Sequence, residues 1–423
     1  MSDGRRTAGG ATAARAAADG GALGAPPGSG RAAAAAAATI GAAAPPVGVP
    51  GARAQVSEGL RRHGVDRATF TALARARGGA PAVRLLRAGQ LSKRALLLVA
   101  LRRAVPAPEW AAFESGYAEV CALQRADRTA WERLLLRPEF DAWAAGCLHL
   151  LAAGRPAPLG GLDRFLHGPR PAAAPVPLEC DGLRWTPLIT DRGPYRDLYG
   201  HPPAGPLEPA ELDRWRLLLA GAWEILVRRH PWHAEAVSAC VTTLVPLYPA
   251  PDGSAVSAAA RRAYGAVAAS RPAEPVLLAL ALVHEFLHVQ LGALLDLVPL
   301  HRPNGEARYH APWRPDLRPA GALLQGAYAH LGVTDFWRGE LAAGAPGRER
   351  AQAEHRRWRG HTGAAAATLL ASGELTRAGE EFAREFGRAA EYGPDCSGGG
   401  AATGAERVDF TAEGAAAGPC SST

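Results

Sequence analysis

The sequence contains a single lysine, Lys93, although its arginines give a formal net charge of +7 over 423 residues. These arginines are scattered, and no basic stripe is interleaved with aromatic residues as on a nucleic-acid-binding surface. Arginine in place of lysine, in a chain rich in alanine, is typical of a GC-rich genome. The charge therefore does not predict nucleic acid as a partner.

Cysteines are few, and none of them are spaced as a metal-binding or redox pair. Without a CxxC motif, the sequence favours free thiols in a reducing cytoplasm over a disulfide framework or a zinc ribbon. The six cysteines are Cys121, Cys147, Cys180, Cys240, Cys396 and Cys420.

Long hydrophobic runs are missing near the start of the chain. Arg5 and Arg6 are not followed by an apolar segment of the kind that an export signal needs. The run Ala32–Ala38 is too short and too weakly apolar to span a bilayer. We therefore expect a cytoplasmic protein with no membrane partner.

Large apolar residues are almost absent from both ends of the chain. Residues 1–54 are mainly Ala, Gly, Pro and Arg, and residues 393–423 return to Gly, Ala, Ser and Thr. Such segments bury too little surface to offset the entropy of ordering, so they are predicted to be disordered tails. Between them we expect a helical region over 55–170 and a metal-binding catalytic domain over 171–392.

The helical region is predicted from its leucines and aromatic residues, which recur at helical spacing over 56–166. Prolines at Pro81, Pro106 and Pro138 divide it into several helices. The region contains no chemical motif, so its aromatic side chains are expected to form a core.

The second half of the chain mixes strand and helix patterns. Residues 178–188 predict a hairpin turning at Asp181-Gly182, and 237–247 and 264–270 predict strands. The remaining patterns predict helices over 207–229, 275–298, 320–337 and 375–388. The expected fold is α+β and mostly helical, with a small zincin-like sheet beside the helix 275–298. In that arrangement, a strand edge can receive an extended peptide.

The strongest chemical signal is the segment His284-Glu285-Phe286-Leu287-His288. On a helix, residues i and i+4 share a face, so both imidazoles can bind one divalent metal. Glu285 would then lie beside a metal-bound water or substrate. The flanking residues are apolar, and burying these polar groups is costly unless a partner such as a metal satisfies them.

A third protein ligand is expected on a following helix or loop. Gln325 lies within the next predicted helix, where its side chain would be aimed at the metal. Asp316 would supply the carboxylate of a triad of two histidines and one carboxylate. His310 and His330 are also good donors, although either could be an ordinary hydrogen-bonded histidine. The spacing leaves these alternatives open.

Arginines near the motif matter if a small dicarboxylate binds at the metal, because a guanidinium can grip a carboxylate with two hydrogen bonds. Arg314 and Arg318 lie between the two predicted helices, and Arg196 lies in the segment 193–197. The alternative is that they are solvated or that they pair with Asp316.

The motif and its surroundings resemble a known family. Residues 284–300 are similar to the HExxH-containing peptide-modification proteins found beside ribosomal peptide gene clusters, which are also found fused to some radical SAM maturases. The resemblance covers roughly residues 56–390. It includes 86–98, 194–197, Ser257, Tyr264-Gly265, 309–316 and 323–329.

The resemblance implies an activity, since members of this family are described as Fe(II)- and 2-oxoglutarate-dependent peptide β-hydroxylases. His284 and His288 would hold Fe(II), and 2-oxoglutarate would chelate the metal while an arginine binds its distal carboxylate. The substrate would be a ribosomally made precursor peptide, hydroxylated at a side-chain β-carbon. A maturase encoded nearby would be a partner, and Glu285 would orient water or substrate or complete the metal shell.

The chain also departs from the family pattern at Gly193, Ala259, Ala260 and His310, which puts the substrate contacts in question more than the metal site. One alternative function is a zinc-dependent peptidase in which Glu285 activates a Zn²⁺-bound water as general base. Another is a peptide-binding protein without catalytic activity. Metal identity separates the first two functions, and turnover of 2-oxoglutarate separates the first from the third.

Overall fold

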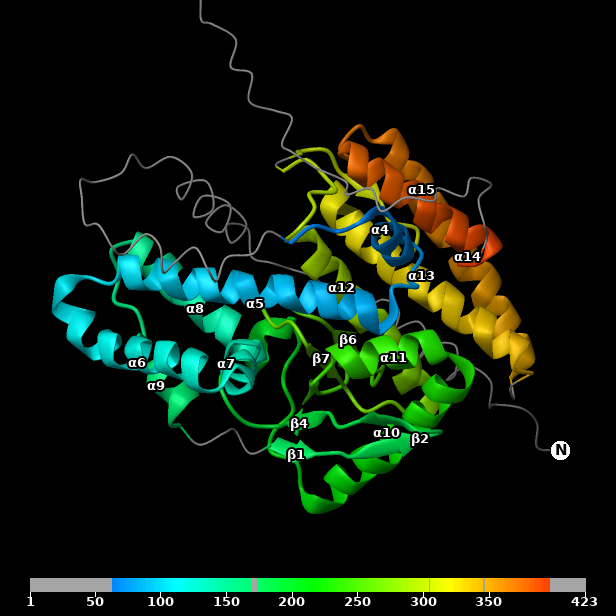
Figure 1. Ribbon diagram of the computed structural model, residues 1–423. Helices are drawn as coiled ribbons and strands as arrows, with labels where there is room; N and C mark the ends of the chain where they lie inside the picture. Colours follow the sequence, from blue (N-terminus) through cyan, green and yellow to red (C-terminus); the bar gives the residue numbers. More distant parts are fainter. Residues whose placement is uncertain (1–62, 169–172, 304, 345–346, 396–423) are drawn as a thin grey trace, which may run out of the picture.

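A computed structural model describes residues 63–168, 173–303, 305–344 and 347–395 (Figure 1). The tail predicted over 1–54 lies outside the described residues. So does the tail predicted over 393–423, except for its first three residues.

The N-terminal region is helical over its described part, as predicted. Two of its helices begin at an aspartate: Asp66 Oδ1 accepts a hydrogen bond from the Thr69 amide at 2.8 Å, and Asp127 Oδ1 accepts one from the Ala130 amide at 2.9 Å. Two others have a proline at their first positions. The helices are α4 (Arg67–Ala74), α5 (Gly79–Ala104), α6 (Ala107–Ala126), α7 (Arg128–Leu135), α8 (Pro138–Ala152) and α9 (Gly161–Leu166).

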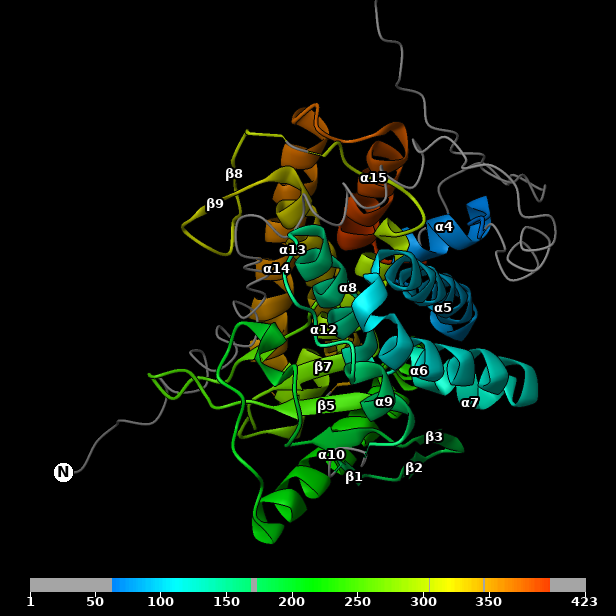
Figure 2. The ribbon, with the colours of Figure 1, turned by 90° about the vertical axis from the view of Figure 1, so that its left-hand side faces the viewer.

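A mixed sheet of five short strands lies beside the motif helix (Figure 2). Its order is β1 (Ala173–Pro175), β4 (Leu188–Thr190), β5 (Thr243–Pro246), β7 (Ala266–Ala269) and β6 (Ser257–Ala258). Strands β4, β5 and β7 are parallel, whereas β1 and β6 pair antiparallel at the two edges. The prediction of a mostly helical α+β fold with a small sheet is confirmed.

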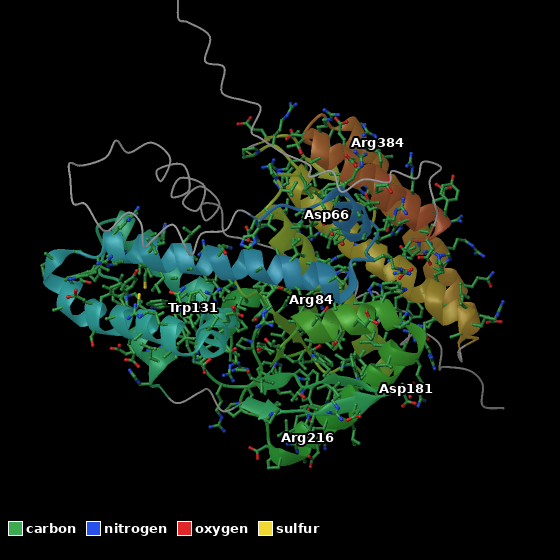
Figure 3. The ribbon with its side chains drawn as sticks, viewed as in Figure 1. Asp66, Arg84, Trp131, Asp181, Arg216 and Arg384 are labelled. Carbon is green, nitrogen blue, oxygen red and sulfur yellow. The ribbon has the colours of Figure 1, made fainter. Side chains whose placement is uncertain are left out.

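The predicted hairpin is also present, as β2 (Leu178–Cys180) and β3 (Leu183–Trp185). Asp181 and Gly182 have φ values of 45° and 82°, the left-handed conformation that a two-residue hairpin turn requires. Figure 3 shows Asp181 at the periphery of the molecule.

The strand predicted over 237–247 is wrong in its first half. Helix α11 (Pro231–Cys240) occupies residues 237–240, and the strand begins only at Thr243. Ala234, Val237 and Val241 are buried at helical spacing, and this packing outweighed the strand preference of the β-branched residues.

One long helix was not predicted, namely α14 (Arg348–Ala371). Its composition is polar and rich in alanine, which weakens the apolar signal. The buried residues Trp358, Thr362, Ala365 and Leu369 nevertheless follow a helical repeat. The other elements are η1 (Arg196–Tyr199), α10 (Pro209–Arg229), β8 (Tyr309–His310), β9 (Leu317–Arg318), α13 (Ala320–Ala342) and α15 (Arg377–Tyr392).

Helix α12 (Pro275–Leu295), which carries the motif, lies in the centre of the fold. It packs against α5, α10, α11, α13, β6 and β7, and its residues are buried without interruption from 277 to 294. Among the described residues, it is the one helix long and apolar enough to cross a membrane, but 89% of that apolar window is buried inside the fold. Such burial is typical of the core helix of a soluble protein.

Two hydrophobic cores meet along helix α5. Its first half contributes Val83 and Leu86 to the main core, which surrounds α12. Its second half contributes Leu98 and Leu101 to a second core, among α6–α9. The second core contains Trp131, labelled among the cyan helices in Figure 3. Helix α5 therefore links the N-terminal helices to the centre of the molecule.

Candidate metal centre

The two motif histidines share one buried face of α12, as their spacing predicts. Their ring centroids are 4.9 Å apart. His284 and Glu285 are each 1% exposed, and His288 is 6% exposed. The motif is therefore inside the protein and not on a solvated helix surface.

Helix α13 brings Gln325 to the motif. Gln325 lies opposite His288, and Gly332 lies opposite Val283 and Leu287, so α12 and α13 run antiparallel. Gln325 Oε1 lies 3.4 Å from His288 Nδ1. The structure therefore brings together three of the predicted site residues, His284, His288 and Gln325.

Several polar atoms of this cluster are buried without a hydrogen bond. They are both ring nitrogens of His284, Nε2 of His288 and Oε2 of Glu285. A buried polar atom without a partner costs about 1–3 kcal/mol. Two imidazoles with unsatisfied nitrogens next to an amide oxygen are chemically suited to a divalent metal ion, which would satisfy them.

Burial also sets the protonation of the motif. It holds the pKa of His284 well below its usual range, helped by the neighbouring His288 and His330, and lowers the pKa of His288 to about 4. Both imidazoles are therefore neutral at pH 7, which is the form that binds a metal.

Glu285 is held by a serine from the edge strand β6. Ser257 Oγ donates to Glu285 Oε1 at 2.7 Å. Burial raises the pKa of Glu285 to about 8, although this hydrogen bond acts in the opposite direction. The family resemblance includes Ser257, but the sequence does not predict its contact with the motif.

His330 lies beside the motif but is packed between aromatic rings. Its ring centroid is 5.0 Å from that of His284. The ring stacks on Trp358 at 4.4 Å and lies tilted against Trp313 at 4.3 Å. Its Nδ1 lies 2.7 Å from the Gly326 carbonyl oxygen. Within the described part of the chain, no group of three or more His, Cys, Asp or Glu side chains is placed to hold a metal ion. The Nδ1 atom of His330 thus faces a backbone carbonyl oxygen, whereas Gln325 Oε1 faces His288 Nδ1.

Asp316 and His310 lie on the small ribbon formed by β8 and β9. The Asp316 carboxylate pairs with Arg314 at 2.5 Å and with Arg318 at 2.9 Å, and its side chain is half exposed. Both arginines lower the pKa of Asp316, although partial burial opposes them. His310 is exposed. The alternative that Arg314 and Arg318 pair with Asp316 is thus what the structure shows.

Arg196 lies at the start of η1, and its hydrogen bond is made outside the motif helix. Its guanidinium donates to the Ala204 carbonyl oxygen. It lines a cavity with Tyr199 of η1 and with Thr190 and Thr243 of the sheet, and not the cavity beside His288.

A small cavity adjoins the candidate metal centre. His288 and Gln325 line it, together with Gln90 from α5 and Arg261 and Tyr264 from the segment before β7. Its volume of about 20 Å³ leaves room for about one water molecule. The sequence does not predict that Gln90 and Arg261 lie here, because no local motif links α5 or the segment before β7 to α12.

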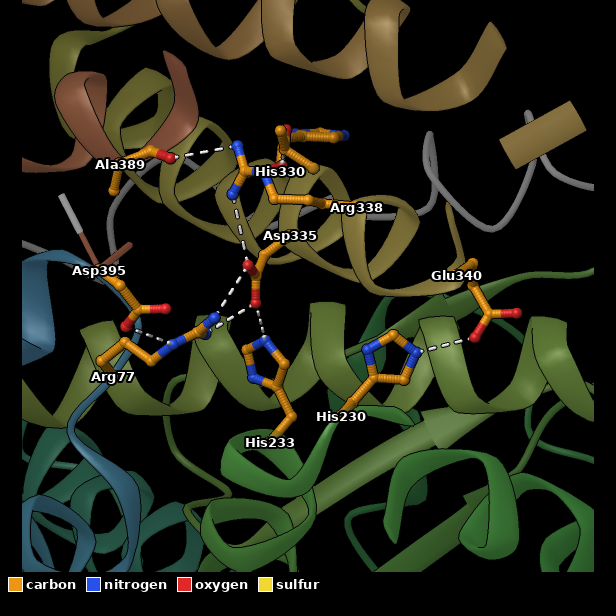
Figure 4. Close-up of polar contacts among 10 residues, drawn as sticks. Arg77, His230, His233, His330, Asp335, Arg338, Glu340, Ala389 and Asp395 are labelled. Carbon is orange, nitrogen blue, oxygen red and sulfur yellow. Dashed lines mark hydrogen bonds and ion pairs between the residues drawn. The ribbon is translucent and has the colours of Figure 1, made fainter. Parts of the chain in front are cut away.

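A second buried polar cluster lies farther along α13, and its carboxylate is paired (Figure 4). Asp335 accepts hydrogen bonds from Arg77 at 2.7 and 3.0 Å and lies 2.9 Å from His233 Nε2. Burial alone would raise the pKa of Asp335, but His233 and Arg77 outweigh it and hold the pKa well below its usual range.

The next carboxylate on α13 is paired in the same way. Glu340 lies 2.9 Å from His230 Nε2 and accepts a hydrogen bond from Arg229 at 2.8 Å. Burial would raise the pKa of Glu340, yet these two partners lower it. Nothing in the sequence spacing indicates either cluster, because the partners are far apart along the chain.

No protein-family model matches this chain, and no curated protein matches it at a significant level. Its proposed function therefore rests on the geometry of the site and on the resemblance of its motifs.

Proposed function

We propose that this protein is an Fe(II)- and 2-oxoglutarate-dependent enzyme that hydroxylates side chains of a ribosomally made precursor peptide at the β-carbon. The observation that carries the proposal is the buried pair His284 and His288. Both ring nitrogens of His284 and Nε2 of His288 lack hydrogen-bond partners, and His288 Nδ1 faces the Gln325 amide oxygen. The resemblance of residues 284–300 to peptide β-hydroxylases supports the choice of reaction.

The donor set suits Fe(II) with a dianionic co-substrate. His284, His288 and Gln325 would each be a neutral ligand, so the ion would retain its full positive charge in a buried site. Coulombic attraction in such a site favours a doubly negative molecule such as 2-oxoglutarate. Bound together, Fe(II) and 2-oxoglutarate supply the oxidising chemistry for hydroxylation when dioxygen is present.

The protein's own residues would exclude water and orient the peptide. The continuous burial of α12 from Leu277 to Leu294 would limit the access of water to the centre. Ser257 fixes one oxygen of Glu285 and leaves Oε2 without a partner. Glu285 would use that oxygen to orient a water molecule or the peptide, or to complete the metal shell.

A zincin-like arrangement would place the peptide along strand β6. This strand is an edge of the sheet, it carries Ser257, and it packs against the motif helix α12. An extended peptide could pair with such an edge through backbone hydrogen bonds. We propose that the reaction takes place in the cytoplasm, on a peptide also modified by a maturase encoded nearby.

One alternative function is a zinc-dependent peptidase, favoured by the position of Glu285 between the two histidines. Its unpartnered Oε2 could accept a proton from a Zn²⁺-bound water. The glutamate would then be a general base, whereas hydroxylation needs no such base.

The test is anaerobic reconstitution of the full chain with Fe(II), followed by 2-oxoglutarate, oxygen and the peptides encoded beside the gene. Succinate release together with a one-oxygen mass gain on one peptide is the expected result. Peptide cleavage that requires zinc, without succinate, would establish the peptidase instead.

Two variants sharpen this test. Glu285→Gln should abolish a peptidase but leave a hydroxylase part of its rate. His310→Gln is the matched control, because this exposed histidine lies outside α12 and should retain full activity under the proposed ligand set.

A further inference from the structure

A buried arginine lies close to the candidate metal centre without a full set of partners. Arg94 on α5 is fully buried. Its Nη1 donates to the backbone oxygen of Gln90 at 3.1 Å and to Gln90 Oε1 at 2.8 Å, but Nε and Nη2 make no hydrogen bond. The carboxylate paired with it, Asp141, is 3.7 Å away, which is too far for a hydrogen bond.

The charges around Arg94 do not balance. Lys93 lies 3.0 Å from Asp141 and 3.2 Å from Asp296, and Arg261 pairs with Asp296 at 2.5 Å. Three cations therefore share two carboxylates, which leaves one excess positive charge. Burial lowers the pKa of Arg94 and Asp141 partly restores it, and an arginine keeps its charge at neutral pH. A buried cation of this kind calls for an additional anion.

The cavity beside the metal centre extends to the neighbours of Arg94. Gln90, which binds the guanidinium, lines this cavity together with His288 and Gln325. The ring of Tyr264 lines it too, and lies 5.8 Å from the guanidinium carbon of Arg94. The cavity walls thus join the candidate metal-binding side chains to the neighbours of the incompletely paired Arg94 guanidinium.

We propose that Arg94 binds the distal carboxylate of 2-oxoglutarate while the other end of the molecule lies at the metal centre. This inference rests on the proposed function and makes it specific to one residue. The arginines considered from the sequence are used elsewhere: Arg314 and Arg318 hold Asp316, and Arg196 binds a carbonyl oxygen near the sheet.

Binding requires the cavity to widen, because its present volume accommodates about one water molecule. Arg261 lines the cavity and its side chain is 40% exposed, so it can move toward solvent. Its movement would also release Asp296, which would remain paired with Lys93.

Calorimetric titration of the full-length protein, loaded with Mn(II) and kept without oxygen, tests the assignment. The probes are 2-oxoglutarate and 2-oxopentanoate, which has the same chain length but no distal carboxylate. The unmodified protein should bind 2-oxoglutarate at least about ten-fold more tightly, as expected for a charge-assisted pair of hydrogen bonds. Arg94→Gln should remove this preference and leave the affinities for Mn(II) and 2-oxopentanoate unchanged.

Asp141→Asn should change the affinity in the opposite direction. It removes a competing carboxylate from Arg94, so 2-oxoglutarate should bind several-fold more tightly, a gain that damaged folding cannot produce. Arg318→Gln is the matched control and should bind both probes as the unmodified protein does.

The outcomes distinguish a failure of the Arg94 assignment from a failure of the proposed function. If Arg94→Gln keeps the preference for 2-oxoglutarate, the assignment of Arg94 is wrong and the proposed function stands. If the unmodified protein binds Mn(II) but not 2-oxoglutarate, both are wrong. If Arg94→Gln does not fold, Asp141→Asn decides, because unchanged or weaker binding of 2-oxoglutarate would contradict the assignment.

Discussion

Helix α13 presents two buried polar clusters that differ in whether their histidines are paired with carboxylates. Toward its start, Gln325 faces His288, and this cluster includes ring nitrogens without hydrogen bonds. Toward its end, Asp335 and Glu340 each bind a histidine and an arginine. Both clusters are buried and both contain histidine, so residue type alone does not distinguish them.

The comparison distinguishes a cluster that stabilises the fold from a cluster that could accept a ligand, along the same helix. A buried carboxylate that is bonded to an arginine and a histidine is satisfied and has no need of a ligand. A buried imidazole with unsatisfied nitrogens lowers the stability of the empty protein and regains that energy when a metal binds. Changes in the two clusters should therefore have opposite effects on stability and on metal binding.

The largest expected effect comes from Asp335→Asn in the paired cluster. Breaking a buried ion pair on one side costs about 3–5 kcal/mol of unfolding free energy, because Arg77 and His233 lose their charged partner. Denaturant titration measures this loss. The Fe(II) affinity of the folded variant should match that of the unmodified protein, and a change in that affinity would contradict the separation of the two clusters.

The next effect is that of His288→Leu in the unpaired cluster. Fe(II) affinity should fall by more than about 100-fold, since losses of 10–100-fold follow already from changing the outer partners of a ligand. The unfolding free energy of the metal-free protein should stay within about 1 kcal/mol, because an apolar side chain replaces an unsatisfied polar one. A loss as large as that of Asp335→Asn would show that the two clusters do not differ.

A smaller effect is expected from Ser257→Ala, which removes the hydrogen bond to Glu285 Oε1. Product formation should fall about 10–100-fold, as for other residues that orient groups at a metal centre. Ser257→Thr keeps the hydroxyl and should restore much of the rate. Product is measured by peptide mass, and equal rates in both variants would rule out an orienting role for the hydroxyl.

The smallest effect is on the response to acid. Because the pKa of Asp335 is held below its ordinary value of 3.8, its contribution to stability is complete above that pH and is lost as the pH falls further. One such group changes stability by at most about 1.4 kcal/mol per pH unit. Denaturant titrations between pH 5 and 2 should therefore show a shallower dependence for Asp335→Asn, and identical slopes would refute this account.

The local parts of the structure were the predictable ones. The spacing of His284 and His288 placed both on one face, and the apolar residues around them indicated a buried helix. The turn at Asp181-Gly182 was predicted for the same reason, because its conformation depends on two adjacent residues. The strand that begins at Thr243 was predicted to begin earlier, at residue 237. Tertiary packing makes the residues before it helical, against their local preference.

The contacts between distant segments could not be predicted. Gln90 meets Asp296 across 206 positions in the sequence, and Arg77 meets Asp335 across 258. A single sequence contains no periodicity that relates such residues. The sequence therefore points to three other arginines, and not to Arg94, as candidates for binding a dicarboxylate. The approach of Gln325 to His288 was the exception, since it follows from two adjacent helices packing antiparallel.

Helix α5 has a consequence for how the molecule unfolds. It crosses from one hydrophobic core to the other without a break, and its Gly89 packs so closely against Leu297 that a Cβ atom would lie 2.9 Å from that side chain. Any opening of the outer helices must therefore disturb the wall of the cavity. We expect amide hydrogens along α5 and α12 to exchange in one cooperative unit, so the outer helices would stabilise the wall of the cavity beside the candidate metal centre.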